Sequence, residues 1–177
     1  MLILASNSPR RRQLLALGDW SIQVAPVAVD ETPWPAEPPR RYVLRLAESK
    51  ARAAAARIDV EAIFLGADTT VADAGRILGK PRDAAEAHRM LSSLRGRTHQ
   101  VYTALAVFQP ASHTLLTDWC LTEVPMRAYS DEEMQRYIAS GDPLDKAGAY
   151  AIQHPEFKPV SNLLGCYANV MGLPLCH

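Results

Sequence analysis

The chain has 177 residues, with 19 basic and 19 acidic side chains and therefore a formal net charge of zero. Its length suits a single domain over residues 1–177, and 48% hydrophobic residues argue against intrinsic disorder. The balanced charge argues against a protein that coats nucleic acid polymers, because such proteins need a large basic excess to displace phosphate counterions.

Secretory and membrane classes find no support in the sequence. No apolar run approaches the roughly 20 residues of a membrane-spanning helix, and the N-terminus begins apolar and then becomes basic, the reverse of a secretory signal. The three cysteines, Cys120, Cys166 and Cys176, show no Cys-x-x-Cys spacing. We therefore expect unpaired thiols, a cytoplasmic location and no membrane partner.

The first half of the chain is predicted to alternate strands and helices. Residues 2–5 form a short buried strand, and a helix follows with Ser8 as N-cap, Pro9 in its first turn and Gly18 at its end. A longer helix is expected over residues 40–57, after a proline-rich loop. Residues 63–65 form a strand that leads into Gly66–Thr70, and residues 76–78 return after a turn.

The second half shows the same mixture. A capping pair, Asp83 and Glu86, starts one helix, and a second pair, Ser130 and Glu133, starts another that ends at Gly141. Strands are expected over residues 98–109, 114–128, 149–153 and 166–173. The whole pattern predicts a layered α/β domain with a partly antiparallel sheet.

An anion site is one interpretation of the first loop. Ser6 and Ser8 offer hydroxyl groups at a helix N-terminus, and the arginines that follow can grip two phosphate oxygens at once. The alternative is an ordinary capped surface helix with solvated arginines. The Gly-rich phosphate loop of P-loop nucleotide triphosphatases is absent.

Lys50 lies on the apolar stripe of the predicted helix over residues 40–57, three residues after Ala47. A lysine in that position either extends to solvent or meets an anion, and the two outcomes are about equally expected. Asp68 follows an apolar strand and is either a turn residue or a carboxylate that holds Mg²⁺ or activates water. Asp145 and Lys146 are expected to form an exposed pair of little energetic weight.

The polar clusters, in their order along the chain, resemble the Maf family of nucleoside triphosphate pyrophosphatases. The matching segments are ASNSPRRRQLL (5–15), VDE (29–31), RLAESKA (45–51), LGADTTV (65–71), GKPRDAAEAHRML (79–91), GRTHQVYT (96–103), GDPLDKAGAYAIQ (141–153) and NVMGLP (169–174). Eight collinear segments that span nearly the whole chain make the resemblance specific.

The resemblance implies an elongated α/β fold with a twisted mixed β-sheet, flanking helices and a central cleft. It implies hydrolysis of a small-molecule nucleoside triphosphate to the monophosphate and pyrophosphate, with a divalent metal, Mg²⁺ or Mn²⁺. The residues that match the family's functional positions are the catalytic Asp68, Lys50 and Lys80, the phosphate-loop residues Ser6, Arg10 and Arg11, and Glu31 as a second acidic position for the metal beside Asp68. A homodimer is also compatible with the resemblance.

Three further positions indicate the family branch. Arg11, Thr69 and Gln153 match the branch that acts on dTTP and UTP, and the amide of Gln153 offers both a donor and an acceptor to a pyrimidine edge. The loop that follows, from His154 to Pro159, differs from the family's usual glycine-containing stretch. Whether Asp68 is the general base or a metal ligand stays open at this stage.

Three alternative hypotheses about the function remain. One is a nucleotide-binding regulator of cell division without turnover, and another is a protein-interaction module whose polar loops are only surface. The third keeps the enzyme and changes its substrate to inosine or modified purine nucleotides.

Overall fold

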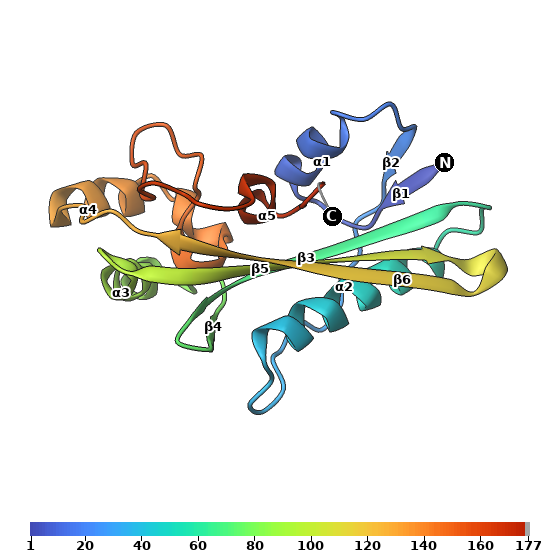
Figure 1. Ribbon diagram of the computed structural model, residues 1–177, viewed down its shortest axis with the longest axis horizontal. Coiled ribbons are helices and arrows are strands. Elements are labelled where there is room, and N and C mark those ends of the chain that lie inside the picture. The colour runs from blue at the N-terminus through green and yellow to red at the C-terminus, as the bar shows by residue number, and fades with distance from the viewer. Residues whose placement is uncertain (176–177) are drawn as a thin grey trace.

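The described part of the chain, residues 1–175 of a computed structural model, is built on one long, twisted mixed sheet (Figure 1). Its six strands are β1 (Leu2–Leu4), β2 (Ile22–Val24), β3 (Ile63–Asp73), β4 (Arg76–Leu78), β5 (Thr98–Gln109) and β6 (Thr114–Pro125). They lie in the order β2-β1-β3-β5-β6, with β4 beside β3. The pairs that involve β1 are parallel, and the others are antiparallel. The sheet is open, and the predicted α/β class is confirmed.

Helices cover both faces of this sheet. They are α1 (Pro9–Leu15), α2 (Pro39–Ala55), α3 (Ala84–Leu94), α4 (Asp131–Ala139) and α5 (Tyr167–Met171), with short 3₁₀ turns at Pro110–Ser112, Asp142–Asp145 and Ala147–Ala149. In Figure 1, α2 lies below the central strands, and α1 and α5 lie above them. No helix in residues 1–175 has both the length and the apolar character needed to cross a membrane.

The predicted helix starts are confirmed by their caps. The Ser8 hydroxyl accepts a hydrogen bond from the Arg11 N–H, and Ser130 and Glu133 form a reciprocal capping box. Asp83 likewise accepts from the Glu86 N–H. Each cap satisfies a backbone donor that the first helical turn leaves without an intrahelical partner.

Helix α2 sits unusually close to β3, because Gly66 presents no side chain to it. A Cβ atom at Gly66 would lie 2.0 Å from the Ala47 carbonyl oxygen and 2.7 Å from the Ala51 nitrogen. The apolar stripe of α2, which includes Val43, Leu46 and Ala47, is fully buried against the sheet. This close packing also brings Lys50, on the same stripe, down onto β3.

Three apolar clusters make up the core of residues 1–175. One joins α2 to the sheet, a second joins α3 and α4 to the far ends of β5 and β6, and a third lies between α1 and β3 around Leu4, Leu15 and Leu173.

Strand β3 is much longer than the predicted strand over residues 63–65. It runs without interruption to Asp73, so Asp68 lies in mid-strand opposite Ala104 of β5 and does not follow a strand end. The polar side chains of Asp68–Thr70 suggested that the strand ends before them, but Asp68 and Thr70 are buried within the sheet. The predicted strand over residues 114–128 ends at Pro125.

Two predicted strands near the C-terminus are wrong. Residues 149–153 follow a 3₁₀ turn in which Gly148 and Ala149 adopt left-handed conformations, with φ of +69° and +61°, which interrupts an extended strand. Residues 167–171, within the predicted strand 166–173, form α5, which Cys166 caps and Gly172 ends at φ +102°. Strand β2 was not predicted, and Cys176 lies outside the described residues.

Candidate active site

A polar pocket of about 420 Å³ opens between elements from both halves of the chain. Its walls come mainly from parts that are distant in sequence: the loop before α1 with the start of that helix, the loop that holds Glu31, α2, the middle of β3, the β4–α3 loop, the segment 145–153, and the end of α5 with Gly172. All the site residues predicted from the sequence line it: Ser6, Arg10, Arg11, Glu31, Lys50, Asp68, Thr69, Lys80 and Gln153. The structure therefore brings these residues to one cavity.

Lys50 occupies the centre of one side of this pocket and faces inward. Its Nζ lies 2.6 Å from Asp68 Oδ1 and 2.7 Å from Glu31 Oε1. The Lys50 and Asp68 side chains are only 11% and 8% exposed, whereas that of Glu31 is 48% exposed. Of the two outcomes that the sequence left open for Lys50, contact with an anion is the one observed.

The position of Glu31 depends on Tyr42, which sequence reasoning did not single out. The Tyr42 hydroxyl donates a 2.9 Å hydrogen bond to the Glu31 carbonyl oxygen and so ties this loop to α2. Because Tyr42 and Lys50 project from the same helix, the loop and the ammonium group are held in a common frame. The spacing of Tyr42, Leu46 and Lys50, four residues apart, could have shown that all three lie on one face of the helix.

The two carboxyl groups on Lys50 differ in their electrostatics. Burial raises the pKa of Asp68, and the charges of Lys50 and Arg11 offset only part of that rise. Burial also acts to raise the pKa of Glu31, but the hydrogen bond and charge of Lys50, with Lys80 and Arg11, outweigh it and leave that pKa lowered. Asp68 is therefore the more basic of the two carboxylates.

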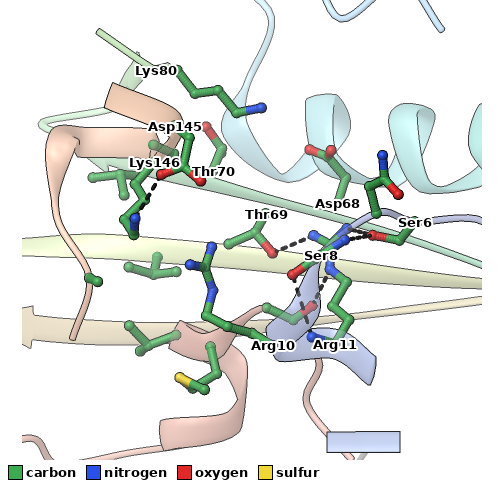
Figure 2. A pocket seen from close by; sticks show the side chains of 18 of the residues that line it. Ser6, Ser8, Arg10, Arg11, Asp68, Thr69, Thr70, Lys80, Asp145 and Lys146 are labelled. Carbon is green, nitrogen blue, oxygen red and sulfur yellow. Dashed lines mark hydrogen bonds and ion pairs between the residues drawn. The ribbon is translucent and has the colours of Figure 1, made fainter. Parts of the chain in front are cut away.

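Arg11 is buried, and its guanidinium binds protein atoms on several sides. Nη1 donates to the Ala67 carbonyl at 2.8 Å and to Ser6 Oγ at 3.1 Å, and Nη2 donates to Thr69 Oγ1 at 3.0 Å (Figure 2). Nε donates to the Gly172 carbonyl at 2.8 Å. Arg11 thus joins α1, β3 and the end of α5 and fixes the pocket wall that Thr69 belongs to. Its neighbour Arg10 extends toward the open part of the pocket in Figure 2.

A second group of charges faces Asp68 from across the pocket. Lys80, Asp145, Lys146 and Thr70 gather there, on the opposite side of the view from Ser6, Ser8 and Asp68 (Figure 2). The pocket is therefore lined by cations at both ends, with carboxylates among them.

Lys146 corrects the expectation of an exposed pair. Its side chain is only 9% exposed, and Nζ donates to the Asp142 carbonyl at 2.6 Å, to Asp142 Oδ1 at 3.0 Å and to Asp145 Oδ1 at 2.7 Å. The segment around Lys146 is not an isolated exposed contact, because Tyr137 also donates to Asp142 and accepts from the Ala151 N–H. Of the two residues, only Asp145, whose side chain is 77% exposed, has the expected exposure.

Gln153 reaches the pocket from a turn instead of the expected strand. It is exposed and follows Tyr150, whose hydroxyl lies 2.7 Å from Nε2 of the buried His99. His99 and Tyr150 therefore support the base of the segment that presents Gln153. The apolar run over residues 149–152 favoured a strand and did not indicate the turn that the structure shows.

Comparisons with known proteins show which family the chain is similar to. The family model described as Maf-like protein matches residues 1–177. A dTTP/UTP pyrophosphatase from Citrifermentans bemidjiense is 46% identical over 176 residues, covering 99% of this chain and 91% of that protein. A dTTP/UTP pyrophosphatase from Myxococcus xanthus is 50% identical over 175 residues, covering 99% of this chain and 87% of that protein. Among solved structures, a HAM1 protein from Coxiella burnetii aligns with 72% of this chain and 73% of its own, at 20% identity and a TM-score of 0.48.

Proposed function

We propose that this chain, which belongs to the Maf-like protein family, hydrolyses dTTP and UTP to the corresponding monophosphate and pyrophosphate. The proposal joins the substrate in the names of its relatives, which are 46% and 50% identical to it, to the chemistry of its own pocket. Hydrolysis breaks the anhydride bond between the α- and β-phosphates, and water supplies the hydroxyl group that ends on one product.

The observation that carries the proposal is the buried Asp68–Lys50 pair, with the half-exposed Glu31 on the same lysine, in a pocket with cations on both sides. Phosphoryl transfer demands chiefly that charge on the phosphate oxygens be stabilised and that the attacking water be oriented. Lys50, Lys80 and Arg10 supply positive charge for the polyphosphate, and Asp68 supplies a carboxylate that can accept the proton of water. An exposed interaction surface would not require a buried lysine between two carboxylates.

A divalent metal, Mg²⁺ or Mn²⁺, suits the acidic residues of the pocket. Asp68 and Glu31 each place an oxygen within 2.7 Å of the same Lys50 nitrogen, so both converge on one cationic position. Mg²⁺ commonly takes one or two protein carboxylates and completes its coordination with substrate phosphates, and Asp68 and Glu31 would supply those carboxylates. When bound, the metal would polarise phosphate oxygens and lower the pKa of a coordinated water.

The residues then divide the chemistry as follows. Asp68 accepts a proton from the attacking water, and burial raises the pKa of its carboxyl group in the metal-free protein. Lys50 orients the Asp68 carboxylate through their 2.6 Å contact and adds charge next to the phosphates. Lys80, Ser6 and Arg10 bind phosphate oxygens, and Lys146 holds Asp142 and Asp145 at the opposite wall.

Thr69, Arg11 and Gln153 are proposed to select the base. Arg11 is bound to Thr69, and Gln153 lines the same pocket. The Gln153 amide nitrogen can donate to a carbonyl oxygen on the pyrimidine edge, a group that thymine and uracil both carry. The proposal includes a cytoplasmic location, where free nucleoside triphosphates are available.

The test is a panel of purified nucleoside triphosphates with Mg²⁺, in which pyrophosphate and orthophosphate are detected separately. We expect pyrophosphate and the monophosphate from dTTP and UTP, with slower release from purine nucleotides. Orthophosphate without pyrophosphate would contradict the cleavage position. Faster turnover of inosine nucleotides would contradict the base preference, and nucleotide binding without turnover would indicate a regulator instead of an enzyme.

A further inference from the structure

A chain of buried hydrogen bonds begins and ends on the α5 segment and passes through Thr69. Arg11 Nε donates to the Gly172 carbonyl, and Arg11 Nη2 donates to Thr69 Oγ1 at 3.0 Å. Thr69 Oγ1 lies 2.9 Å from Thr103 Oγ1. Thr103 Oγ1 in turn donates to the Asn169 carbonyl at 2.9 Å. Thr103 is fully buried on β5, and it does not line the pocket.

The direction of the middle hydrogen bond follows from counting hydrogens. A threonine hydroxyl has one hydrogen, and Thr103 gives its hydrogen to the Asn169 carbonyl, which can only accept. The hydrogen between the two threonines must therefore come from Thr69. At the other end Arg11 can only donate, so Thr69 accepts from it. Both neighbours enforce the same orientation of the Thr69 hydroxyl.

The far end of the chain is firmly anchored. Asn169 is fully buried, and its Nδ2 donates to the Val101 carbonyl at 3.1 Å and to Thr122 Oγ1 at 2.8 Å. These bonds fix α5 against β5 and β6 and so hold the Asn169 carbonyl over Thr103. At the near end, Gly172 lies so close to Thr69 that an added Cβ would be 3.1 Å from Thr69 Oγ1.

Thr69 consequently has no hydrogen left for a ligand. Its oxygen has two lone pairs, of which Arg11 uses one, so it offers the pocket a single acceptor. A ligand group placed against Thr69 must donate a hydrogen bond. Thymine and uracil carry an N–H at ring position N3, whereas cytosine carries a lone pair there.

We propose that Thr103 is a positioning residue that locks Thr69 as a hydrogen-bond acceptor, and that this lock favours thymine and uracil nucleotides over cytosine nucleotides. The inference rests on the proposed function and deepens it, because it assigns a physical cause to the base preference. Thr103 does not touch the nucleotide. It acts by consuming the only hydrogen that Thr69 could offer to cytosine N3.

The test compares kcat/KM for dTTP and dCTP in the wild-type protein and in Thr103→Val. Valine has nearly the shape of threonine but no hydroxyl, so Thr69 regains a hydrogen for the ligand. We expect the dCTP-to-dTTP ratio of kcat/KM to rise by about tenfold, the effect of one well-placed hydrogen bond. Thr103→Ser, which keeps the hydroxyl, should retain the wild-type ratio.

Thr122→Val is the matched control. Thr122 is also buried and also bound to Asn169, but its hydrogen bonds within the described residues go to the Asn169 side chain and the Cys166 carbonyl, not to Thr69. The dCTP-to-dTTP ratio of kcat/KM in Thr122→Val should equal that of the wild type, even if the variant is less stable. An equal rise in Thr122→Val would contradict the proposal, because the effect would then reflect loosening of α5.

Two further measurements keep the inference testable if Thr103→Val folds poorly. Thr103→Ala removes the same hydroxyl together with the γ-methyl group, and the same rise in the dCTP-to-dTTP ratio of kcat/KM is expected. The wild-type protein should cleave N3-methyl-dTTP, which lacks the N3 hydrogen, at least about tenfold more slowly than dTTP. Equal cleavage of the two would overturn the proposal.

The outcome separates the inference from the proposed function. No pyrophosphate release from any nucleotide by the wild-type protein would contradict the function. A wild-type preference for dTTP that is unchanged in folded Thr103→Val would leave the function standing and contradict the role of Thr103.

Discussion

The Lys50 ammonium group and the Asp68 carboxylate, 18 residues apart in the sequence, meet at 2.6 Å beneath the pocket, where both side chains are almost completely buried. Helix α2 supplies the lysine and strand β3 the aspartate, and the two elements pack without a side chain between them at Gly66. The backbone packing of the fold thereby determines the charge arrangement of the site.

Lys50→Met should destabilise the protein by about 3 kcal/mol at pH 7, because it leaves Asp68 buried without its cation. The double variant Lys50→Met/Asp68→Asn should recover part of that loss, since it removes the uncompensated charge. Urea unfolding measures both effects. The exposed pair Arg52–Glu48 provides the control, and Arg52→Met should change the free energy of unfolding by less than about 1 kcal/mol. Additive losses in the double variant would contradict the coupling.

The activity should fall on the acid side at a pH above that of an ordinary aspartate. Burial raises the pKa of Asp68, and only its ionised form can accept a proton from water, so kcat/KM decreases as the pH falls through that raised pKa. This decrease in kcat/KM is the acid limb of the pH profile, and its midpoint should lie above about pH 3.9, the usual pKa of an aspartate.

Glu31→Gln tests the assignment of that limb to Asp68. The negative charge of Glu31 contributes to the raised pKa of Asp68, so its removal should move the acid limb to lower pH. A wild-type limb at or below 3.9 would argue against Asp68 as the base, and a shift to higher pH in Glu31→Gln would argue against the charge coupling.

His99 should make the protein less stable in acid. Burial lowers its pKa from 6.5 to about 4, and His99 Nδ1 has no hydrogen-bond partner within residues 1–175, so a protonated ring would bury an unpaired N–H. The unfolded chain therefore binds a proton at higher pH than the folded chain does. The contribution of His99 to stability is full above pH 6.5 and is lost as the pH falls to 4, by about 3 kcal/mol in total.

Unfolding curves of His99→Gln between pH 7 and 4 check this expectation. The decline in stability over that range should be smaller than in the wild type, because the substituted side chain does not titrate. His88→Gln, at an exposed position on α3, should follow the wild-type curve. If the free energy of unfolding declines equally in His99→Gln and the wild type over this pH range, other groups cause the loss of stability.

Gly66→Ala should destabilise the fold by more than about 3 kcal/mol, because the new methyl group would collide with the backbone of α2 at Ala47 and Ala51. Thermal unfolding gives the comparison with Gly79→Ala, where an added Cβ meets nothing within 4 Å. A cost for Gly66→Ala as small as that for Gly79→Ala would mean that α2 can move away from β3 freely.

Helix caps and apolar stripes were sufficient to predict most of the fold. Ser8, Asp83 and Ser130 each cap a helix, and the apolar stripe of α2 correctly includes Lys50. The C-terminal segment was harder, because its conformation depends on distant partners. The hydrogen bonds of Asn169 dock α5 on β5 and β6, and the positive φ of Gly148 and Ala149 bends the chain where the apolar run predicts a strand.

The sequence predicts which residues form the site better than it predicts the contacts among them. Family motifs place Asp68, Lys50, Lys80 and Glu31 in one pocket, as observed. No local pattern shows that Thr103 bonds to both Thr69 and Asn169, because these contacts join residues 34 and 66 positions apart. The partners of Lys146, Asp142 and Asp145, are close in sequence, but its burial depends on how the 3₁₀ turn packs and is not visible in the local pattern.

The most direct test of the account is the turnover of dTTP by Asp68→Asn, compared with Asp73→Asn at the exposed end of the same strand, where the carboxylate pairs with Arg97. If Asp68 takes the proton from water, kcat should fall by about 100-fold or more in Asp68→Asn while the protein stays folded, and Asp73→Asn should keep nearly the wild-type rate. Near-normal pyrophosphate release by folded Asp68→Asn would contradict the central role of this carboxylate.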